Sequence, residues 1–450
     1  MTECNLQAIE LSSVKSKKIL ADFNGGTLVS DAGAVLLREL DKRIGLIDAI
    51  NRSIVDRRNP FFIVHQQRTM LAQRIFGIAL GYEDLNDHQS LRDDPLFQII
   101  SERGVTKDGL PLASPPTLCR LENRVDRKGL VDIAGALVEN FVASFRQPPD
   151  ELILDFDATD DPVHGNQERR FFHGYYDNYC FLPLYLFCGT QLLVAYLRPA
   201  DIDGSLHSRA ILKLLVKRIR QRWPNVKIIF RGDSGFCRWR LMRWCDRNNV
   251  GYIIGLARNP VLENLGRRLI DSARRQFEQT HHKQRVFGDI SYAAETWDRQ
   301  RRIIVKAEHL ERGQNTRFLV TNLEGGPQKL YDELYCQRGE AENRIKEQQL
   351  HLFADRTSCH DFVANQFRVL LSAAAYVLMD TLRRQALADT ELSNAQVDTI
   401  RLKLLKIGAR IVCSVRRIVI HLAGSYPFKH IFAHVLSHLR APATPAVASP

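Results

Sequence analysis

Three acidic residues occupy positions where carboxylates often carry out chemistry. Asp155 and Asp157 lie two residues apart at the end of the apolar run 152–157, so a strand there places both on one face of a sheet. Asp233 follows a second apolar run, 226–230, within a Gly-Asp-Ser-Gly turn. If the two strands are parallel neighbours, their carboxylates emerge at the same sheet edge, where open α/β sheets place their sites. Each Asp taken alone is more often a helix cap or a turn residue.

Glu342 supplies a third carboxylate within a patterned helix. Tyr335, Arg338 and Glu342 are spaced i, i+3 and i+7, which places them on one helical stripe, and Lys346 extends this stripe by one turn. A polar stripe of mixed charge does not face an apolar core. It indicates either an exposed, salt-bridged helix or a helix that faces a site, and the two Asp-tipped strands favour the site.

Three carboxylates from separate elements are the hard oxygen ligands that suit Mg²⁺ or Mn²⁺. Two such ions about 3.5–4 Å apart activate a water or hydroxyl and stabilise the leaving oxygen in phosphodiester cleavage. Without the ions the carboxylates would repel one another, which predicts that metal or substrate completes the site.

The elements that must position these residues predict an α/β fold. Strand-like and helical runs follow one another in the order β-β-β-α-β-α-β between residues 151 and 257. This order predicts a mixed five-stranded sheet with flanking helices. Residues 258–330 interrupt the alternation with charged, strand-like runs and are interpreted as a β-rich insertion, after which the chain becomes helical again.

At these positions the sequence resembles the DDE transposases of bacterial insertion sequences. It is most similar to their "thirteen-eighty" group, which is related to the hairpin-forming "four" group. The resemblance covers nearly the whole chain, and its most specific pieces are LDFDATD at 154–160, FRGDSGF at 230–236 and the pattern Tyr335-x2-Arg338-x3-Glu342. It implies a ribonuclease-H-like fold with a β insertion before the catalytic Glu, in agreement with the strand order.

The resemblance implies the catalytic residues. The Asp-x-Thr pattern of the family falls on 157–159, which makes Asp157 the first catalytic and metal-binding carboxylate. Asp155 remains its rival, because both share one face. The second and third carboxylates fall on Asp233 and Glu342. The implied cofactor is Mg²⁺, with Mn²⁺ as a substitute and two ions in each site.

The resemblance also implies residues that bind DNA. The Tyr-Arg-Glu-Lys signature of related families places Tyr335 and Arg338 beside the catalytic Glu, but its lysine position holds Gln349 here. Lys346 lies near the same helical face and is the expected substitute. In related transposases a Trp of the insertion receives a flipped base when a DNA hairpin forms, and Trp297 is the Trp of this insertion. Packing in a core is the alternative role of Trp297.

The charge of the chain suits a polyanionic partner. The 450 residues contain 63 Lys and Arg against 51 Asp and Glu, a net charge of +12. Residues 401–450 hold eight Lys and Arg and no acidic residue. We expect Arg416 and Arg417 there, and Arg120 and Arg124 on a short helix that follows Ser114-Pro115, to contact DNA. Solvated basic surfaces are the alternative in both places.

Composition argues against a membrane or secreted protein. No run of eighteen apolar residues exists, and the N-terminus lacks a basic region followed by an apolar one. Nine scattered cysteines without a Cys-x-x-Cys motif predict reduced thiols in the cytosol. We therefore expect a cytoplasmic protein without a membrane partner.

These observations predict a transposase with five sequential regions. They are a mainly helical DNA-binding region (1–150), the first part of the catalytic core (151–257), the β-rich insertion (258–330), the second part of the core with the Glu helix (331–386) and a basic C-terminal region (387–450). The resemblance implies double-stranded DNA as partner, both transposon terminal inverted repeats and target DNA, and a homodimer in a synaptic complex. The alternatives are a catalytically silent DNA-binding regulator and a ribonuclease-H-like nuclease.

Overall fold

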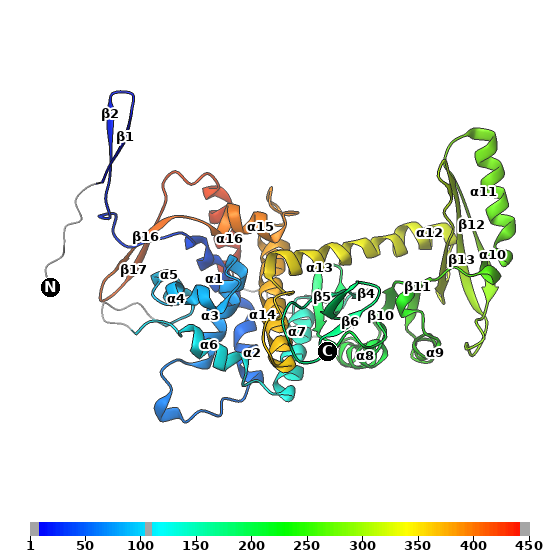
Figure 1. Ribbon diagram of the computed structural model, residues 1–450, viewed down its shortest axis with the longest axis horizontal. Helices are drawn as coiled ribbons and strands as arrows, with labels where there is room; N and C mark the ends of the chain where they lie inside the picture. Colours follow the sequence, from blue (N-terminus) through cyan, green and yellow to red (C-terminus); the bar gives the residue numbers. More distant parts are fainter. Residues whose placement is uncertain (1–8, 104–109, 442–450) are drawn as a thin grey trace. The chain divides into compact units, whose positions relative to one another are not determined.

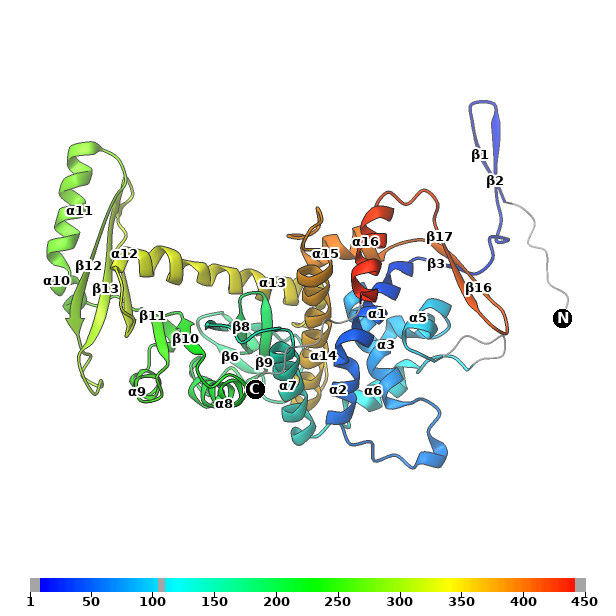
Figure 2. The ribbon, with the colours of Figure 1, turned by 180° about the vertical axis from the view of Figure 1, so that it is seen from behind.

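The computed structural model describes residues 9–103 and 110–441, which form two compact units (Figures 1 and 2). The first unit combines described residues up to Arg43 with those of Arg58–Cys119 and Thr381–Ala441, and the second contains Ile44–Arg57 and Arg120–Asp380. The five sequential regions remain a prediction, because the compact units follow contacts between segments and not sequence order. Some residues from within 1–150 lie in the second unit, where one of their helices packs against the sheet.

The second unit is built on a mixed sheet that has nine strands in the described chain. Its strands are β4 (Glu151–Ala158), β8 (Leu184–Cys188), β9 (Gln191–Tyr196), β10 (Lys227–Gly232), β11 (Gly251–Leu256), β12 (Gln284–Tyr292), β13 (Arg301–Leu310), β14 (Gly313–Gln314) and β15 (Arg317–Thr321). Five of them lie in the order β9-β8-β4-β10-β11, with β10 parallel to β4 and β11, and β8 antiparallel to β4 and β9. This confirms the predicted ribonuclease-H-like sheet.

The predicted insertion continues this sheet and forms no sheet of its own in the described chain. Strand β15 pairs antiparallel with β11, and β13 and β12 follow it outward, with β14 folded back on β13. The sequence did not predict this pairing. It satisfies the backbone groups that β11 would otherwise expose as an edge strand.

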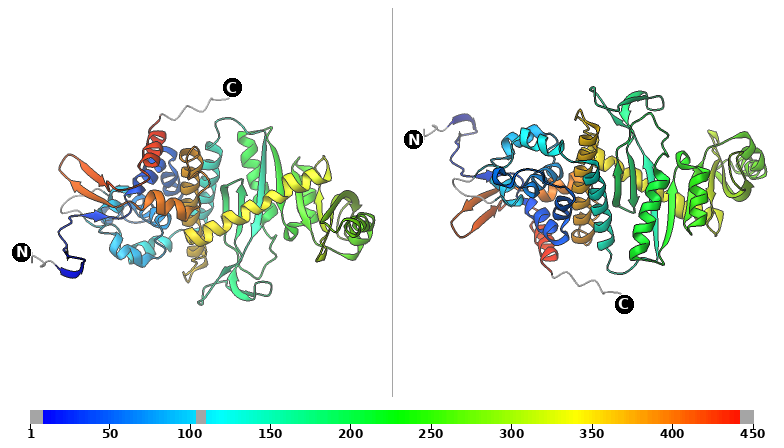
Figure 3. Two further views of the ribbon diagram at one scale, coloured as in Figure 1. Left: turned by 90° about the horizontal axis from the view of Figure 1, so that it is seen from above. Right: turned by 90° about the horizontal axis from the view of Figure 1, so that it is seen from below.

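Helices cover both faces of the sheet. Those wholly or mostly in this unit are α2 (Leu46–Ser53), α7 (Arg127–Ala143), α8 (Ser208–Arg222), η4 (Ser234–Phe236), α9 (Trp239–Arg247), α10 (Pro260–Leu265), α11 (Arg267–Thr280), α12 (Pro327–Lys329), η5 (Leu330–Tyr335), η6 (Cys336–Arg338), α13 (Gly339–Leu352) and α14 (Phe362–Thr381). The continuous stretch from α12 to α13 crosses one face of the sheet, and α8 and α9 lie on the other (Figures 1 and 3).

We call these faces the α13 face and the α8 face. Leu154 and Phe156 of β4 belong to the large core cluster of the α8 face, which residues of α7, α8 and α9 complete. Ile153 packs with a smaller cluster that includes Leu334 and Tyr335 of η5, on the α13 face. Because side chains alternate along a strand, Asp155 and Asp157 share the α13 face with Ile153.

A small sheet extends from the end of β4. It contains β5 (Asp161–Pro162), β6 (Phe171–His173) and β7 (Asn178–Phe181), in the order β5-β7-β6 with antiparallel pairing. Only two residues separate β5 from the end of β4, so this sheet begins beside the catalytic strand.

The first unit is mainly helical. Its helices are η1 (Ala32–Ala34), α1 (Val35–Ile44), η2 (Pro60–Phe62), α3 (Gln67–Leu80), η3 (Leu85–Asp87), α4 (His88–Leu91), α5 (Pro95–Ile100), η7 (Leu382–Ala386), α15 (Val397–Ile400), η8 (Arg401–Leu405) and α16 (Lys429–Arg440), and α6 (Pro115–Glu122) has residues in both units. Its strands are β1 (Ile9–Val14), β2 (Lys17–Ala21), β3 (Leu28–Val29), β16 (Ala409–Cys413) and β17 (Ile418–Leu422). They form a β1-β2 hairpin and a sheet in the order β17-β16-β3.

One helical stretch in the described chain is long and apolar enough to cross a bilayer. It covers Phe362–Ala386, and 89% of its most apolar window is buried inside the protein. Burial of this extent is typical of a core helix.

Candidate active site

Asp155 is held inside the α13 face by an arginine of the neighbouring strand. Arg231 of β10 is its register partner, and the guanidinium contacts both carboxylate oxygens, with Nη2 donating to Oδ2 at 2.7 Å. The same guanidinium donates through Nη1 to the backbone carbonyl of Leu334. Both charged side chains are almost fully buried. Arg231, held in place by Asp155, therefore fastens η5, which precedes the Glu helix, to the sheet, and the oxygens of Asp155 are already engaged.

Asp157 lies two residues farther along the same face and meets a different environment. Arg338 of η6 donates through Nη1 to its Oδ2 at 3.2 Å. Burial raises the pKa of Asp157 from its ordinary value of 3.8 to about 7, an effect that Arg338 opposes and that the charges of Asp233 and Glu342 reinforce. Asp157 is thus a desolvated carboxylate with two acidic neighbours.

Asp233 reaches the same edge from β10. The parallel register pairs Arg231 with Asp155 and Gly232 with Phe156, so the next residue, Asp233, comes level with Asp157. Its Oδ1 accepts a hydrogen bond from the backbone N–H of Gly235 at 2.8 Å, which begins η4. This cap fixes the orientation of the half-buried carboxylate.

Glu342 approaches from the helix that crosses this face. It forms an ion pair with Arg338 one turn earlier, and its side chain is 43% exposed. The helix before it is irregular: η5 is a π-helix and η6 a 3-10 helix, and α13 begins only at Gly339. Such irregular turns occur often at functional sites, because they re-aim side chains. Arg338, the last residue of this irregular stretch, pairs with both Asp157 and Glu342 and so bridges the two carboxylates.

Tyr335 closes the site at the strand side. Its pKa is raised by burial, while a hydrogen bond and the charge of Arg338 lower it. A Cβ on Gly255 of β11 would lie 2.8 Å from the hydroxyl of Tyr335 and 2.8 Å from the backbone nitrogen of Ser234. Only glycine at position 255 lets the tyrosine and the turn after β10 approach this strand together.

Gln349 occupies the position at which the related signature has its lysine, and its side chain connects two segments of the fold. Its Nε2 donates to the backbone carbonyl of Asp160 at 3.0 Å, which ties α13 to the connection between β4 and β5. Lys346, one turn after Glu342, is exposed. The helix thus presents an exposed cation near the carboxylates without using position 349.

The donor set fits divalent metal ions in its chemistry. Within residues 9–103 and 110–441, no three or more His, Cys, Asp and Glu side chains stand together as a formed metal site. Arg338 instead supplies the positive charge between Asp157 and Glu342. Carboxylate oxygens are the ligands that Mg²⁺ and Mn²⁺ prefer. Burial is the main cause that raises the pKa of Asp157 to about 7, with the charges of Asp233 and Glu342 adding to it, and a cation beside this carboxylate would favour its ionised form.

Residues 11–444 match the family described as Transposase DDE domain group 1. The chain belongs to this family of DDE transposases. A solved structure, the cryo-EM structure of a piggyBac transposase synaptic complex with hairpin DNA, is similar to this transposase with a TM-score of 0.44 and 9% sequence identity, over 84% of this chain and 80% of that chain. No curated protein matches the sequence significantly.

Trp297 does not lie among the carboxylates of this transposase. Its indole packs against the large core cluster of the α8 face and makes an edge contact with Tyr292, with ring centroids 5.5 Å apart. The following Asp298 forms an ion pair with Arg301, which in turn binds Asp246 of α9. The loop between β12 and β13 is therefore fastened to α9. These contacts agree with packing, the alternative role of Trp297, and its stacking on a base remains a prediction.

The arginines predicted on the short helix differ in exposure. Arg120 is exposed on α6, whereas Arg124, just after the helix, is half-buried and lies 3.6 Å from the carboxylate of Asp56. Arg124 therefore contributes to packing between segments of the second unit, which the sequence pattern did not indicate.

The basic residues after position 400 fall into two groups. Arg401 donates to the carbonyl oxygens of Ile78 and Ala79 at the end of α3, and Lys406 forms an ion pair with Asp31 at 2.6 Å. These two cations stabilise the first unit from inside. Arg416 and Arg417 instead occupy the exposed turn between β16 and β17.

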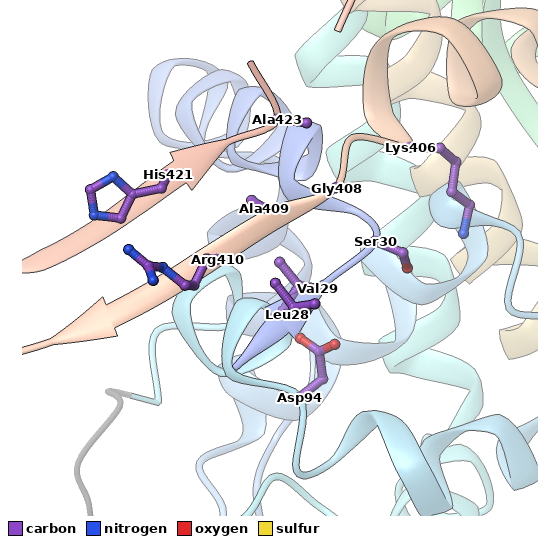
Figure 4. A pocket seen from close by; sticks show the side chains of 10 residues that line it. All are labelled: Leu28, Val29, Ser30, Asp94, Lys406, Gly408, Ala409, Arg410, His421 and Ala423. Atoms are coloured by element: carbon purple, nitrogen blue, oxygen red, sulfur yellow. The ribbon is translucent and has the colours of Figure 1, made fainter. Parts of the chain in front are cut away.

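A pocket of about 850 Å³ lies beside that hairpin (Figure 4). Its lining residues come from β3, the start of α5, β16, β17 and their flanks, namely Leu28, Val29, Ser30, Asp94, Lys406, Gly408, Ala409, Arg410, His421 and Ala423. Arg410 and His421, which are paired in the β16-β17 register, are exposed at its rim. The pocket contains none of the three candidate catalytic carboxylates.

Two features of the site were missed in the sequence. Arg231 was not singled out, although its position before Asp233 on a buried strand marks a charged residue that needs a partner. The second feature is Tyr176, half-buried in the turn after β6, where Asp160, Asp157 and Asp233 add to the burial that raises its pKa to about 12. The aromatic run of residues 171–179 was the available signal.

Proposed function

We propose that this transposase cleaves DNA at the ends of a transposable element and joins the freed 3′-hydroxyl to target DNA. The supporting observation is the convergence of Asp157, Asp233 and Glu342 on one face of the sheet, with Arg338 paired to Asp157 and Glu342. Mg²⁺ or Mn²⁺, two ions in each site, held by these three carboxylates, would supply activation of the attacking hydroxyl and stabilisation of the leaving oxygen.

The remaining residues position the DNA in this proposal. Arg338 carries a planar guanidinium that pairs with carboxylates in this state and suits a phosphate equally well. Tyr335 fixes the stretch before α13 against β11, so that Arg338 and Glu342 keep their direction. Lys346 lies exposed on the same helix and adds a cation for the DNA backbone. Asp155 and Arg231 hold the helix on the sheet and touch no DNA.

The proposed partners are double-stranded DNA, at both the terminal inverted repeats and the target, and a second copy of the chain in a synaptic complex. Two ends must be processed together for the element to move, which favours a homodimer. For the second strand we propose a hairpin intermediate, supported by the Tyr335-x2-Arg338-x3-Glu342 pattern that the sequence shares with hairpin-forming relatives.

The experiment uses the full chain and a labelled duplex that carries one end of the encoding element. We expect cleavage with Mg²⁺ or Mn²⁺, and a loss of at least about 10³-fold in Asp157→Asn, Asp233→Asn and Glu342→Gln, since these groups stabilise transition-state charge. DNA binding should persist in all three. Glu151→Gln, at the exposed start of β4, is the matched control.

Three outcomes separate the alternatives. Full activity of Asp157→Asn together with loss in Asp155→Asn would move the first carboxylate to Asp155. Unchanged activity of all three variants would overturn the proposal, and specific binding without cleavage would favour a silent regulator. Denaturing gels decide the second-strand route, because a hairpin migrates as a strand of twice the length.

A further inference from the structure

The hairpin of β6 and β7 exposes several aromatic rings. Phe172, Tyr175 and Tyr179 are 53%, 86% and 51% exposed, and Phe171 is also exposed. The chain as a whole contains only 8% aromatic residues, so four exposed rings within nine residues form a local concentration. Exposed apolar side chains that gather in this way mark a surface that binds something.

One cation lies on a ring of this hairpin, and a second lies on a ring of α14 beside it. The guanidinium carbon of Arg170 is 4.8 Å from the ring centroid of Tyr179, and Phe172 packs edge-to-face on the same tyrosine, with centroids 5.6 Å apart. Phe172 and Tyr179 are register partners, so both rings stand on one face of the hairpin. Arg169 lies over the ring of Phe362 at 5.4 Å. The surface therefore combines flat rings with positive charge.

The hairpin is anchored to the catalytic strand. Strand β7 pairs with β5, which follows β4 directly, and Nδ2 of Asn178 donates to Asp160 at 3.3 Å. The ring of Tyr176, at the turn, packs on His173 with centroids 5.0 Å apart. Nε2 of Gln349 donates to the backbone carbonyl of Asp160 at 3.0 Å, which ties the start of this small sheet to α13, the helix that carries Glu342.

A second anchor holds the segment before β6. The backbone N–H of Glu168 donates to the carbonyl of His360 at 2.9 Å, and its carboxylate accepts from the N–H of Phe362 at 3.2 Å. Gln167 reaches the carbonyl of Thr357. The rings are thus presented by a segment that is fixed at both ends, so that little ordering is required when a ligand binds.

We propose that the β6-β7 hairpin is a stacking surface for unpaired bases of the DNA strand next to the cleaved phosphate. A base offers a flat face, and rings interleaved with arginines are the combination by which proteins bind single strands without reading sequence. Within a duplex the faces are hidden by neighbouring base pairs, so only a strand end or an opened pair fits these rings. The placement beside a DNA strand rests on the proposed function, whereas the affinity for single strands does not.

The test measures binding of the full chain to fluorescein-labelled oligothymidylate of about 12 nucleotides, within the range of single-strand sites, in EDTA so that cleavage plays no part. Tyr175→Ala and Phe172→Ala should each weaken binding by about 5-fold to about 100-fold, the loss typical of a stacked base. Tyr175→Phe should bind as the wild type does. Tyr175→Leu, which keeps an apolar side chain without a ring, should behave like the alanine variant.

Fully paired duplex DNA is the matched control ligand, and its affinity should not change in these variants. Unchanged melting temperatures would show that the exposed rings do not support the fold. Oligothymidylate affinity that survives both alanine variants would overturn the proposal, and equal binding by Tyr175→Leu and wild type would point to an apolar protein contact instead. Ring-dependent binding by a chain that cuts no DNA would uphold the stacking surface while refuting the proposed function.

Discussion

The two faces of the large sheet are built from alternate residues of the same strands, yet they do different things. On the α8 face, Leu154, Phe156 and Phe230 form a closed apolar cluster with helices packed over it. On the α13 face, a cluster of only four buried residues gives way to Asp155, Asp157 and Arg231 toward the carboxyl ends of the strands.

This difference shows how one sheet is both stable and reactive. The closed face supplies the burial that holds the strands in register, so the other face can tolerate buried charge. Within the α13 face a further division exists, because Asp155 has its own counterion whereas Asp157 shares Arg338 with Glu342. These contacts favour a structural role for Asp155 and make Asp157 the better candidate for the first catalytic carboxylate.

The largest expected effect follows from breaking the structural pair. Arg231→Met should lower the free energy of unfolding by about 3–5 kcal/mol, because it leaves Asp155 buried without a counterion. Thermal and denaturant unfolding of the full chain measure the loss. The matched control is Glu151→Gln, which breaks the exposed pair between Glu151 and Lys227 on the same two strands and should cost less than about 1 kcal/mol.

The double variant Asp155→Leu/Arg231→Met should recover most of the stability, since it removes both buried charges at once. Equal losses from the buried and the exposed pair would contradict the division between Asp155 and Asp157.

The next effect has the opposite sign. Asp157→Asn should raise the free energy of unfolding at pH 8 by about 2–4 kcal/mol, since a pKa near 7 in the folded chain against an ordinary 3.8 makes ionisation in place unfavourable. The folded state retains a proton between these two values, so wild-type stability falls as the pH rises from about 4 to 7. The free energy of unfolding of Asp157→Asn should not show this fall with pH. The difference in stability between this variant and the wild type should therefore vanish near pH 4.

Unfolding curves across pH 4 to 8 check this expectation, with Asp155→Asn as the comparison. Burial also raises the pKa of Asp155, but Asp155→Asn should destabilise the chain, because it leaves the buried guanidinium of Arg231 without a counterion. If both asparagine variants change stability in the same direction, the two aspartates do not have the separate roles that their contacts indicate.

The sequence was sufficient to predict the elements that local patterns encode. The strands that became β4, β8, β9, β10 and β11 were visible as short apolar runs, and their order predicted the mixed sheet that the structure confirms. The convergence of Asp157, Asp233 and Glu342 followed from strand ends and helical spacing. Their catalytic roles remain predictions.

What the sequence could not supply are contacts between segments far apart in the chain. Local sequence patterns do not predict that β15 pairs with β11, or that Arg231 forms its ion pair with Asp155 and not with Asp157. The π-helix before α13 is also invisible to a 3.6-residue pattern, because it depends on how the chain is held between Tyr335 and the sheet. Trp297 was assigned by analogy, and its contact with DNA remains a prediction; the ion pairs that fasten its loop to α9 could not be predicted from the sequence.

A smaller effect tests the closed face directly. Trp297→Ala should lower the free energy of unfolding by about 1–3 kcal/mol, less than for a fully buried Trp, because the indole is only partly buried against the cluster. Trp297→Phe should lose less. The ratio of hairpin to nicked product on denaturing gels should stay unchanged in both variants. A selective loss of hairpin product at normal stability would show instead that Trp297 contacts DNA during hairpin formation.

The smallest effect contrasts the two groups of basic residues after position 400. If Arg416 and Arg417 at the exposed turn contact phosphates, replacing both with Ala should flatten the slope of log affinity against log salt by up to about two units, at about 0.9 per phosphate. Arg401→Ala is the matched control. Its guanidinium already binds the carbonyls that end α3, so this variant should lower the melting temperature and leave the slope unchanged.

Fluorescence anisotropy between about 50 and 200 mM salt measures the slopes. If Arg401→Ala flattens the slope as much as the double variant does, the effect is not specific to the exposed turn. If the double variant leaves the slope unchanged, Arg416 and Arg417 contact no phosphate.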